Sequence, residues 1–291
     1  MGLLDGRVAL ITGAARGMGR AHAVAHAREG ADVVLVDVAA PLPTVAYPGA
    51  SADDLAETAR LVEKHGRTAL TFEADVRDQQ QLDDAVAEAV ARLGRIDVLV
   101  ANAGIWTQAP FWELSDEAWE EMIGVNLSGV WRSAKAVTPH MIERGSGSIV
   151  LISSTNGLEP GVNFAHYTSA KHGVIGLMRN IALELAPHGV RCNAISPGAT
   201  NTPMVNHPKA WARFGGRPDA GEEVMIPAGL RFHALRDHSF LPPERIADAG
   251  VFLSSDLASA VTGVVLPVDA GHLLLTGANS ADMGLRVASG D

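Results

Sequence analysis

Short runs of β-branched apolar residues alternate along the chain with longer, alanine-rich segments whose apolar residues recur at helical spacing. The short runs are bounded by Gly, Pro or Asp and predict buried strands, whereas the longer segments predict helices. We expect strands at residues 8–12, 32–36, 68–73, 97–101, 148–152, 190–195 and 263–268. We expect helices at residues 17–29, 53–65, 79–93, 115–142, 165–186 and 243–253.

This alternation predicts an α/β fold in which a doubly wound parallel sheet of about seven strands has helices on both faces. Strand–helix units of this kind are typical of a Rossmann-like architecture. Because no Gly/Ser linker divides the chain, we expect a single domain over residues 1–275. The tail, residues 276–291, is expected to fray.

Two segments interrupt the alternation. Residues 38–52 follow the second strand and contain Pro41, Pro43 and Pro48, which indicate an extended, stiff insertion. Residues 200–241 contain scattered prolines and glycines and are expected to be irregular. Long irregular segments inside a domain are typically lids or binding loops, so we expect both segments to lie over a binding site.

Charge and cysteine content exclude several classes of protein. The net charge is −10, from 33 acidic and 23 basic residues, which argues against a nucleic-acid partner. The one cysteine, Cys192, can form neither an intrachain disulfide nor a thiolate metal cluster, and the scattered histidines predict no metal site. No secretion signal or membrane span is predicted, so we expect a cytoplasmic protein.

A glycine-rich turn follows the first strand and opens the first helix. Gly13 permits a tight turn, Gly17 lets a pyrophosphate approach the backbone, and Gly19 lets the helix pack on the sheet. Asp37 ends the second strand, where a carboxylate can accept hydrogen bonds from ribose hydroxyls and repel a 2′-phosphate. Arg16 could instead pair with such a phosphate. We interpret Asp37 as the stronger signal, so the turn predicts NAD as cofactor.

Tyr167 and Lys171 share one face of a predicted helix because they are four residues apart. A nearby ammonium lowers the pKa of a tyrosine, as does oxidised nicotinamide, so the pair can act as a general base on an alcohol. Ser153 and Ser154 end the fifth strand, at the edge where parallel sheets bind ligands. Neighbouring strand residues point in opposite directions, so we expect one of these serines to hold the substrate oxygen.

Taken together, these motifs resemble the short-chain dehydrogenase/reductase family over about residues 5–272. The matching segments, in the family's order, are Thr12 to Gly19, Asp75-Val76, Asn102-Ala103-Gly104, the tetrad Asn126, Ser154, Tyr167 and Lys171, and Pro197-Gly198 with Thr202. The resemblance implies Tyr167 as acid/base, Lys171 on the nicotinamide ribose, Ser154 on the substrate oxygen and Asn126 holding a relay water. The cofactor-binding residues that it implies are Gly13, Arg16, Gly17, Met18, Gly19, Asp37, Val38, Asp75, Val76, Asn102, Ala103, Gly104, Tyr167, Lys171, Pro197, Gly198, Thr200 and Thr202.

The insertion carries a narrower resemblance. Asp37, the Ala-Pro-Leu-Pro run, Tyr47-Pro48 and the helix that begins at Asp53 are similar to those of carveol-dehydrogenase-like, mycofactocin-associated members of the family. Those enzymes hold NAD tightly and pass electrons to a redox partner. The resemblance implies a secondary alcohol or its ketone as substrate, such as a cyclic terpenoid alcohol, and a homotetramer. His233 and His238 could contact substrate, and seven aromatic residues near the expected cleft indicate an apolar pocket: Trp106, Phe111, Trp112, Phe164, Trp211, Phe214 and Phe232.

Three alternatives remain open at this stage. The same tetrad serves a carbonyl or 3-oxoacyl reductase, because the residues that catalyse oxidation also catalyse reduction. A catalytically silent dinucleotide sensor could share the fold. The insertion could also be a structural loop or an oligomer contact.

Overall fold

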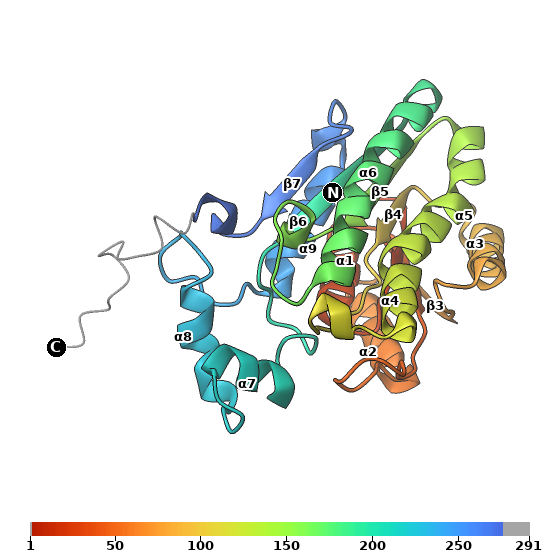
Figure 1. Ribbon diagram of the computed structural model, residues 1–291. Helices are drawn as coiled ribbons and strands as arrows, with labels where there is room; N and C mark the ends of the chain where they lie inside the picture. The colour runs from red at the N-terminus through yellow and green to blue at the C-terminus, as the bar shows by residue number, and fades with distance from the viewer. Residues whose placement is uncertain (1, 276–291) are drawn as a thin grey trace.

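Seven parallel strands form one sheet in the computed structural model, which describes residues 2–275, so the tail predicted to fray lies outside the described residues. The order across the sheet is β3-β2-β1-β4-β5-β6-β7 (Figure 1). The strands are β1 (Val8–Thr12), β2 (Asp32–Asp37), β3 (Ala69–Glu73), β4 (Val98–Ala101), β5 (Gly147–Ile152), β6 (Val190–Pro197) and β7 (Val265–Val268). The predicted fold class is confirmed, with each strand within about two residues of its expected bounds.

Alternate residues of each strand enter two apolar clusters, one on each face of the sheet. In β1, Val8 and Leu10 join one cluster, while Ala9 and Ile11 join the other. This division follows from the two-residue period of a strand. Because both faces are covered, the central strands consist almost entirely of buried apolar residues.

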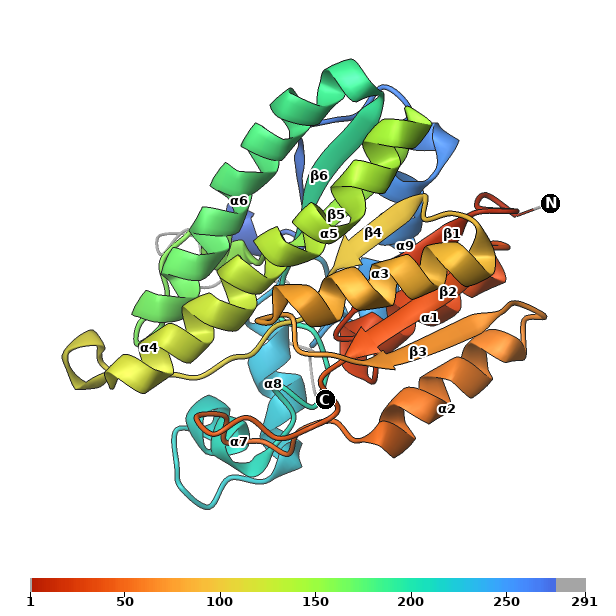
Figure 2. The same cartoon turned by 90° about the vertical axis from the view of Figure 1, so that its right-hand side faces the viewer.

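Two groups of helices cover these faces (Figure 2). One face packs against α1 (Gly17–Arg28), α2 (Ala52–Glu63) and α9 (Pro243–Ser254). The other packs against α3 (Gln79–Leu93), α4 (Asp116–Ile123), α5 (Gly129–Arg144) and α6 (Ala165–Leu185). No helix within residues 2–275 is long and apolar enough to cross a membrane.

The helix predicted over residues 115–142 is interrupted. A π-helical segment, Gly124–Ser128, separates α4 from α5. Two tertiary contacts accompany it. The α carbon of Gly129 lies so close to the Val76 side chain that an added Cβ would stand 2.6 Å from it, and the Asn126 side chain bonds the backbone of Ile105. A single π turn of this kind often marks a functional site.

The segment 200–241 is also more regular than predicted. It contains α7 (Pro208–Gly215), a short 3-10 turn (Glu222–Val224) and α8 (Met225–Leu230). The expectation of an irregular loop was therefore wrong for these stretches. Pro208 and Pro227 lie in the first turns of their helices, where the missing N–H removes no intrahelical bond.

A pair of buried histidines joins α1 to α9. His26 Nε2 lies 3.1 Å from the hydroxyl of Ser254, and its Nδ1 lies 2.8 Å from the carbonyl of His22. Both ring nitrogens of His22 are buried without a hydrogen-bond partner among the described residues. Burial lowers the pKa of His22 to about 3 and that of His26 to about 4.

This pair predicts a loss of stability in mild acid. A histidine whose pKa is lowered in the folded state takes up a proton when the protein unfolds. It therefore does not affect the free energy of unfolding above pH 6.5, and it lowers that free energy increasingly as the pH falls towards the pKa of the folded state. Each histidine should lower the free energy of unfolding by about 1.4 kcal/mol per pH unit in this window. The free energy of unfolding should be measured with urea at several pH values between 7 and 5. Its dependence on pH should be weaker in His22→Leu than in the unmodified protein, and unchanged in the exposed control His65→Leu. Equal slopes in all three proteins would contradict this account.

Candidate active site

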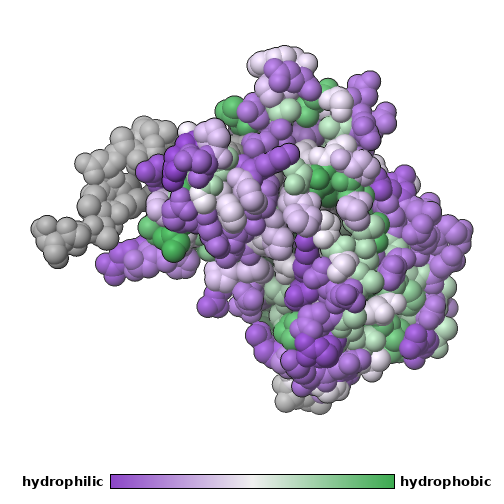
Figure 3. Space-filling model, turned by 90° about the horizontal axis from the view of Figure 1, so that it is seen from below, coloured by the Kyte–Doolittle hydropathy of each residue, from purple (hydrophilic) through white to green (hydrophobic). Residues whose placement is uncertain are grey.

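Two adjoining pockets lie where the parallel strands end. The first, here called the glycine pocket, is lined by residues that follow β1, β2, β3 and β4 and by the insertion 38–52. The second, here called the aromatic pocket, is lined by residues that follow β5 and β6, by the segment 200–241 and by the turn after β7. Met18, Thr202 and Met204 line both pockets. Figure 3 views this end of the molecule and shows a mixed surface of polar side chains and apolar patches.

The glycine-rich turn has the geometry of an anion cradle. Gly13 and Gly17 have φ of +65° and +55°, values that side chains disfavour. A Cβ on Gly19 would stand 1.9 Å from the carbonyl oxygen of Gly13, so α1 begins in direct contact with the turn. Within residues 2–275, no side chain caps the start of α1 and its first turn has no acidic residue. The free amides at this helix terminus suit a phosphate group.

Asn102 and Ala103 fasten this turn to the end of β4. Their amides donate to the hydroxyl of Thr12 over 3.1 Å each. The Asn102 side chain donates to the carbonyl oxygens of Thr12 and Gly13 over 3.0 and 3.2 Å. These bonds hold the turn against the end of β4, and Gly104 lies beside it in the pocket wall.

Asp37 is buried at the end of β2, and its carboxylate accepts hydrogen bonds from the amides of Ala15 and Ala39, each 3.0 Å long. The guanidinium of Arg16 donates to the carbonyl of Pro48 and lies 5.9 Å from the centre of the Tyr47 ring. Both residues line the glycine pocket, and the arginine is bonded to the insertion.

The insertion is fastened to α4 through a buried carboxylate. Glu121 is 7% exposed and accepts hydrogen bonds from the Thr44 amide over 3.1 Å and from the Thr44 hydroxyl. Arg77 donates to the other oxygen of Glu121 over 3.1 Å and to Asp75 over 2.6 Å. Burial alone would raise the pKa of Asp75, but its hydrogen bonds with Arg77 shift that pKa downward. The predicted pair Asp75-Val76 lines the glycine pocket beside this network.

Tyr167 and Lys171 lie together on α6, with the ammonium 5.7 Å from the centre of the ring. Lys171 donates to the carbonyl of Ile152 over 2.9 Å, and burial lowers its pKa to about 8. Burial raises the pKa of Tyr167, while a hydrogen bond with Ser154 lowers it, and the net shift is upward. The protein alone therefore does not produce the lowered tyrosine pKa that sequence predicted.

The two serines after β5 have different partners. Ser153 donates to the backbone carbonyl of Lys171 over 2.9 Å and so holds α6 against the strand. Ser154 bonds Tyr167 and accepts from the amide of Asn156 over 3.1 Å. Of the two, Ser154 therefore has its hydroxyl beside the candidate base.

Asn126, the fourth residue of the predicted tetrad, lies in the π-helical segment. Its side chain accepts from the amide of Ile105 and donates to the carbonyl of Ile105, each over 2.8 Å. A Cβ added to Gly104 would stand 3.5 Å from the Asn126 side-chain oxygen and 3.8 Å from the Lys171 ammonium. Gly104 thus lies next to both groups, and the four predicted residues gather at one place.

The remaining predicted residues lie in the walls of the two pockets. Val38 and Ala103 line the glycine pocket, and Pro197, Gly198 and Thr200 line the aromatic pocket. The Thr200 hydroxyl donates to the Gly198 carbonyl over 2.9 Å, which fixes this turn after β6.

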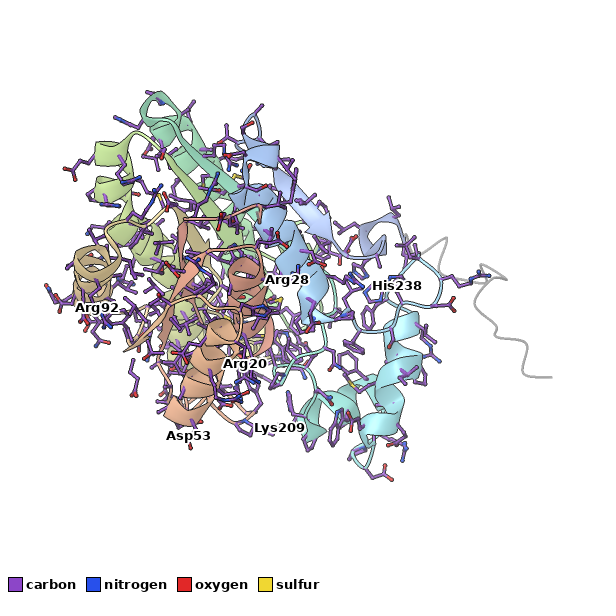
Figure 4. All side chains as sticks on the ribbon, turned by 180° about the vertical axis from the view of Figure 1, so that it is seen from behind. Arg20, Arg28, Asp53, Arg92, Lys209 and His238 are labelled. Carbon is purple, nitrogen blue, oxygen red and sulfur yellow. The ribbon has the colours of Figure 1, made fainter. Side chains whose placement is uncertain are left out.

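The aromatic residues expected near substrate divide into two sets. Four of them line the aromatic pocket: Trp106, Phe164, Phe214 and Phe232. Phe111 and Trp112 are largely exposed, while Trp211 donates to Asn206 over 2.7 Å. His233 is buried and His238 is exposed on the segment after α8 (Figure 4), and the described pocket linings include neither.

Several residues at this site are not indicated by any sequence motif. In the sequence, Glu121 and Arg77 resemble any other charged residues, because the residues that they bond across the site are distant in the chain. Glu159 and His272 line the aromatic pocket and are hydrogen-bonded to each other, with no motif around either residue to indicate it. Among the described residues, no group of three or more His, Cys, Asp or Glu could hold a metal ion.

Comparison with known proteins gives concordant matches. The model of the short chain dehydrogenase family matches residues 7–213. A (−)-trans-carveol dehydrogenase of Rhodococcus erythropolis is 46% identical over 94% of this chain and 100% of its own length. An uncharacterized NAD-dependent oxidoreductase of Mycobacterium tuberculosis is 43% identical over 94% of this chain and 98% of its own length. The crystal structure of a carveol dehydrogenase from Mycobacterium avium in complex with NAD superposes with a TM-score of 0.92, at 44% identity over 94% of this chain and 100% of the other.

Proposed function

Because the chain belongs to the short-chain dehydrogenase family, we propose that it oxidises a secondary alcohol to a ketone with NAD as acceptor and Tyr167 as base. The observation that carries this proposal is the hydrogen bond between Ser154 and Tyr167 beside the buried Lys171, in a pocket that adjoins the glycine cradle. A nicotinamide held there would supply the hydride acceptor. An intact tetrad at one place speaks against a catalytically silent sensor.

The residues of the chain divide the proton chemistry among them. Ser154 orients the alcohol oxygen, and the phenolate of Tyr167 takes its proton. Lys171 brings positive charge to the tyrosine, which offsets part of the effect of burial. Asn126 keeps the loop after β4 against the π segment and so holds Lys171 and Gly104 in their relative places.

The glycine pocket suits the dinucleotide. The amides at the start of α1, where no side chain among the described residues caps the helix, would hold the pyrophosphate. Asp37 would accept hydrogen bonds from the adenosine ribose, and Asp75-Val76 would border the adenine. Pro197, Gly198, Thr200 and Thr202 would border the nicotinamide.

The position of Asp37 predicts a strong preference for NAD over NADP. Asp37→Ser removes the charge that repels a 2′-phosphate, so the ratio of kcat/KM for NAD to that for NADP should fall by about tenfold or more. Asp53→Ser makes the same change at an exposed position on α2 (Figure 4) and should leave the ratio unchanged. An NADP preference in the unmodified protein would refute the assignment.

The aromatic pocket favours a bulky apolar alcohol. Its wall combines several aromatic rings with the hydroxyls of Ser154 and Tyr167 at one place. We propose a cyclic terpenoid alcohol, in keeping with the carveol dehydrogenases that this chain resembles. A panel of cyclic and acyclic secondary alcohols, assayed with an artificial electron acceptor, tests this, and equal rates across the panel would count against it.

The insertion 38–52 would retain the cofactor. Leu42, Val45 and Tyr47 line the glycine pocket, and Tyr47 accepts from the Trp106 amide over 3.3 Å and packs on His207 at 5.4 Å. Because the insertion crosses the pocket and is bonded on both sides, it should slow the release of NAD. A redox partner would then reoxidise the bound NADH in place, as in mycofactocin-associated enzymes. Protein purified without added NAD should still contain dinucleotide, and cofactor-free protein that exchanges NAD freely would oppose this reading.

We also propose the homotetramer of the family, in a cytoplasmic enzyme. Exposed apolar side chains on α4, α5 and α6, namely Trp119, Trp131 and Leu183, offer surface for subunit contacts. Sedimentation velocity would show a monomer if this were wrong.

A further inference from the structure

Three phenylalanines form one part of the wall of the aromatic pocket. Phe214 lies 6.0 Å from Phe232 and 5.1 Å from Phe240, measured between ring centres. Phe214 belongs to α7, whereas Phe232 and Phe240 follow α8. This wall therefore comes from the segment 200–241, whose helices α7 and α8 pack on each other and on the 3-10 turn between them.

His272 ties this wall to the rest of the pocket. Its Nδ1 lies 2.7 Å from the carbonyl of Phe232, and its Nε2 lies 2.5 Å from a carboxylate oxygen of Glu159. The two ring nitrogens thus bond the carbonyl of one segment and the carboxylate of another, so the imidazole bridges them. The ring also packs on Phe232, with 5.9 Å between centres. Glu159 follows β5, so the tie spans three segments of the pocket.

The turn that carries His272 is itself firmly held. Ala270 has a φ of +47°, which side chains adopt rarely, and its carbonyl accepts from the amides of Ala234 and Leu235 over 2.9 and 3.0 Å. Asp269 accepts from the amides of Gly271 and Leu273 over 2.9 and 3.0 Å. A strained turn braced on both sides presents the imidazole at a fixed position.

We infer that Glu159 and His272 form a specificity-determining pair. The pair holds the phenylalanine wall at the distance from Ser154 and Tyr167 that an alcohol with a rigid apolar ring requires. The inference deepens the proposed function and rests on it for the identity of the substrate. Both side chains line the aromatic pocket, but the hydrogen bonds of Ser154 and Tyr167 do not pass through them. They are thus positioning residues, and they should affect binding of a bulky alcohol far more than the chemical step.

The test compares two alcohols and several variants of the full-length protein. The probes are 4-isopropylcyclohexanol, which would reach the wall, and 2-butanol, which would not. Glu159→Ala removes the acceptor, Glu159→Gln keeps a neutral one, and His272→Phe keeps the ring but removes both donors. Glu184→Ala removes an exposed carboxylate from α6 and serves as the matched control. We would measure kcat and KM, and the Kd of each alcohol by ligand-observed NMR.

For the cyclic alcohol, KM and Kd should rise about tenfold in Glu159→Ala and in His272→Phe, the effect of one lost hydrogen bond to a charged group. Glu159→Gln should recover most of this loss, and kcat and the constants for 2-butanol should stay at the values of the control. An equal loss for both alcohols, a fall in kcat alone, or an unchanged Kd for the cyclic alcohol would overturn the inference. If neither alcohol is oxidised but the cyclic one binds and the variants weaken it, the proposed function fails while the role of the pair stands.

Discussion

Replacement of Tyr167 by phenylalanine should lower kcat for alcohol oxidation by about 10³-fold, within the range that general acid–base groups contribute. The substitution removes one oxygen and leaves the ring, so the packing of Tyr167 on Phe164, at 6.3 Å between ring centres, can persist. The Kd for NAD should change little, because the glycine turn and Asp37 are untouched. Steady-state rates and calorimetric titration with NAD would measure both quantities.

A matched control lies two residues away on the same helix. Ser169 is exposed on α6, so Ser169→Ala also removes one hydroxyl but should leave kcat and the Kd for NAD unchanged. Near-normal turnover in Tyr167→Phe would refute the mechanism. Loss of NAD binding together with turnover would instead show that the tyrosine acts through the structure of the site.

Local signals in the sequence indicated Tyr167, Lys171 and the two serines after β5, whereas Asn126 followed only from the family resemblance. Tyr167 and Lys171 share a helical face by their spacing alone, and the strands end where β-branched runs end. The upward pKa shift of Tyr167 could not be predicted, since it depends on how deeply the assembled site buries the phenol. Lys171 is likewise buried, which lowers its own pKa and limits the charge that it offers.

Features fixed by contacts between distant segments were not predicted. The π-helical turn at Gly124–Ser128 depends on the approach of Gly129 to Val76 and on the bonds of Asn126 to Ile105. The spacing of apolar residues in the sequence does not distinguish a continuous helix from one that contains such a turn. The helices α7 and α8 are hard to predict for a different reason: Pro208 and Pro227 indicate breaks in a helical pattern, but each lies in a first helical turn.

The contacts of Glu121 likewise could not be predicted from sequence. Its partners Thr44 and Arg77 are far from it in sequence, yet all three meet where the insertion crosses the glycine pocket. Figure 2 shows the insertion, drawn between β2 and α2, running past the carboxyl end of the sheet. A buried carboxylate whose two oxygens bond two different segments resists their separation, since opening would leave that charge without partners.

Opening of the insertion should therefore limit release of NAD, and Thr44→Val should speed it. The substitution keeps the shape of the side chain and the amide bond to Glu121 but removes the hydroxyl bond to that carboxylate. The dissociation rate of NADH should rise about tenfold, which corresponds to one hydrogen bond to a charged acceptor. A chase of bound NADH with excess NAD, followed by NADH fluorescence, measures this rate directly.

Thr138→Val is the matched control, because the Thr138 hydroxyl bonds the Ala134 carbonyl within α5 and lies outside the glycine pocket lining described. Its dissociation rate should equal that of the unmodified protein. Glu121→Gln should release NADH faster than Thr44→Val, since it weakens the bonds to Thr44 and to Arg77 together. If all four proteins release NADH at one rate, the insertion does not govern retention. If only Glu121→Gln is fast, Arg77 and Asp75 rather than the insertion control release.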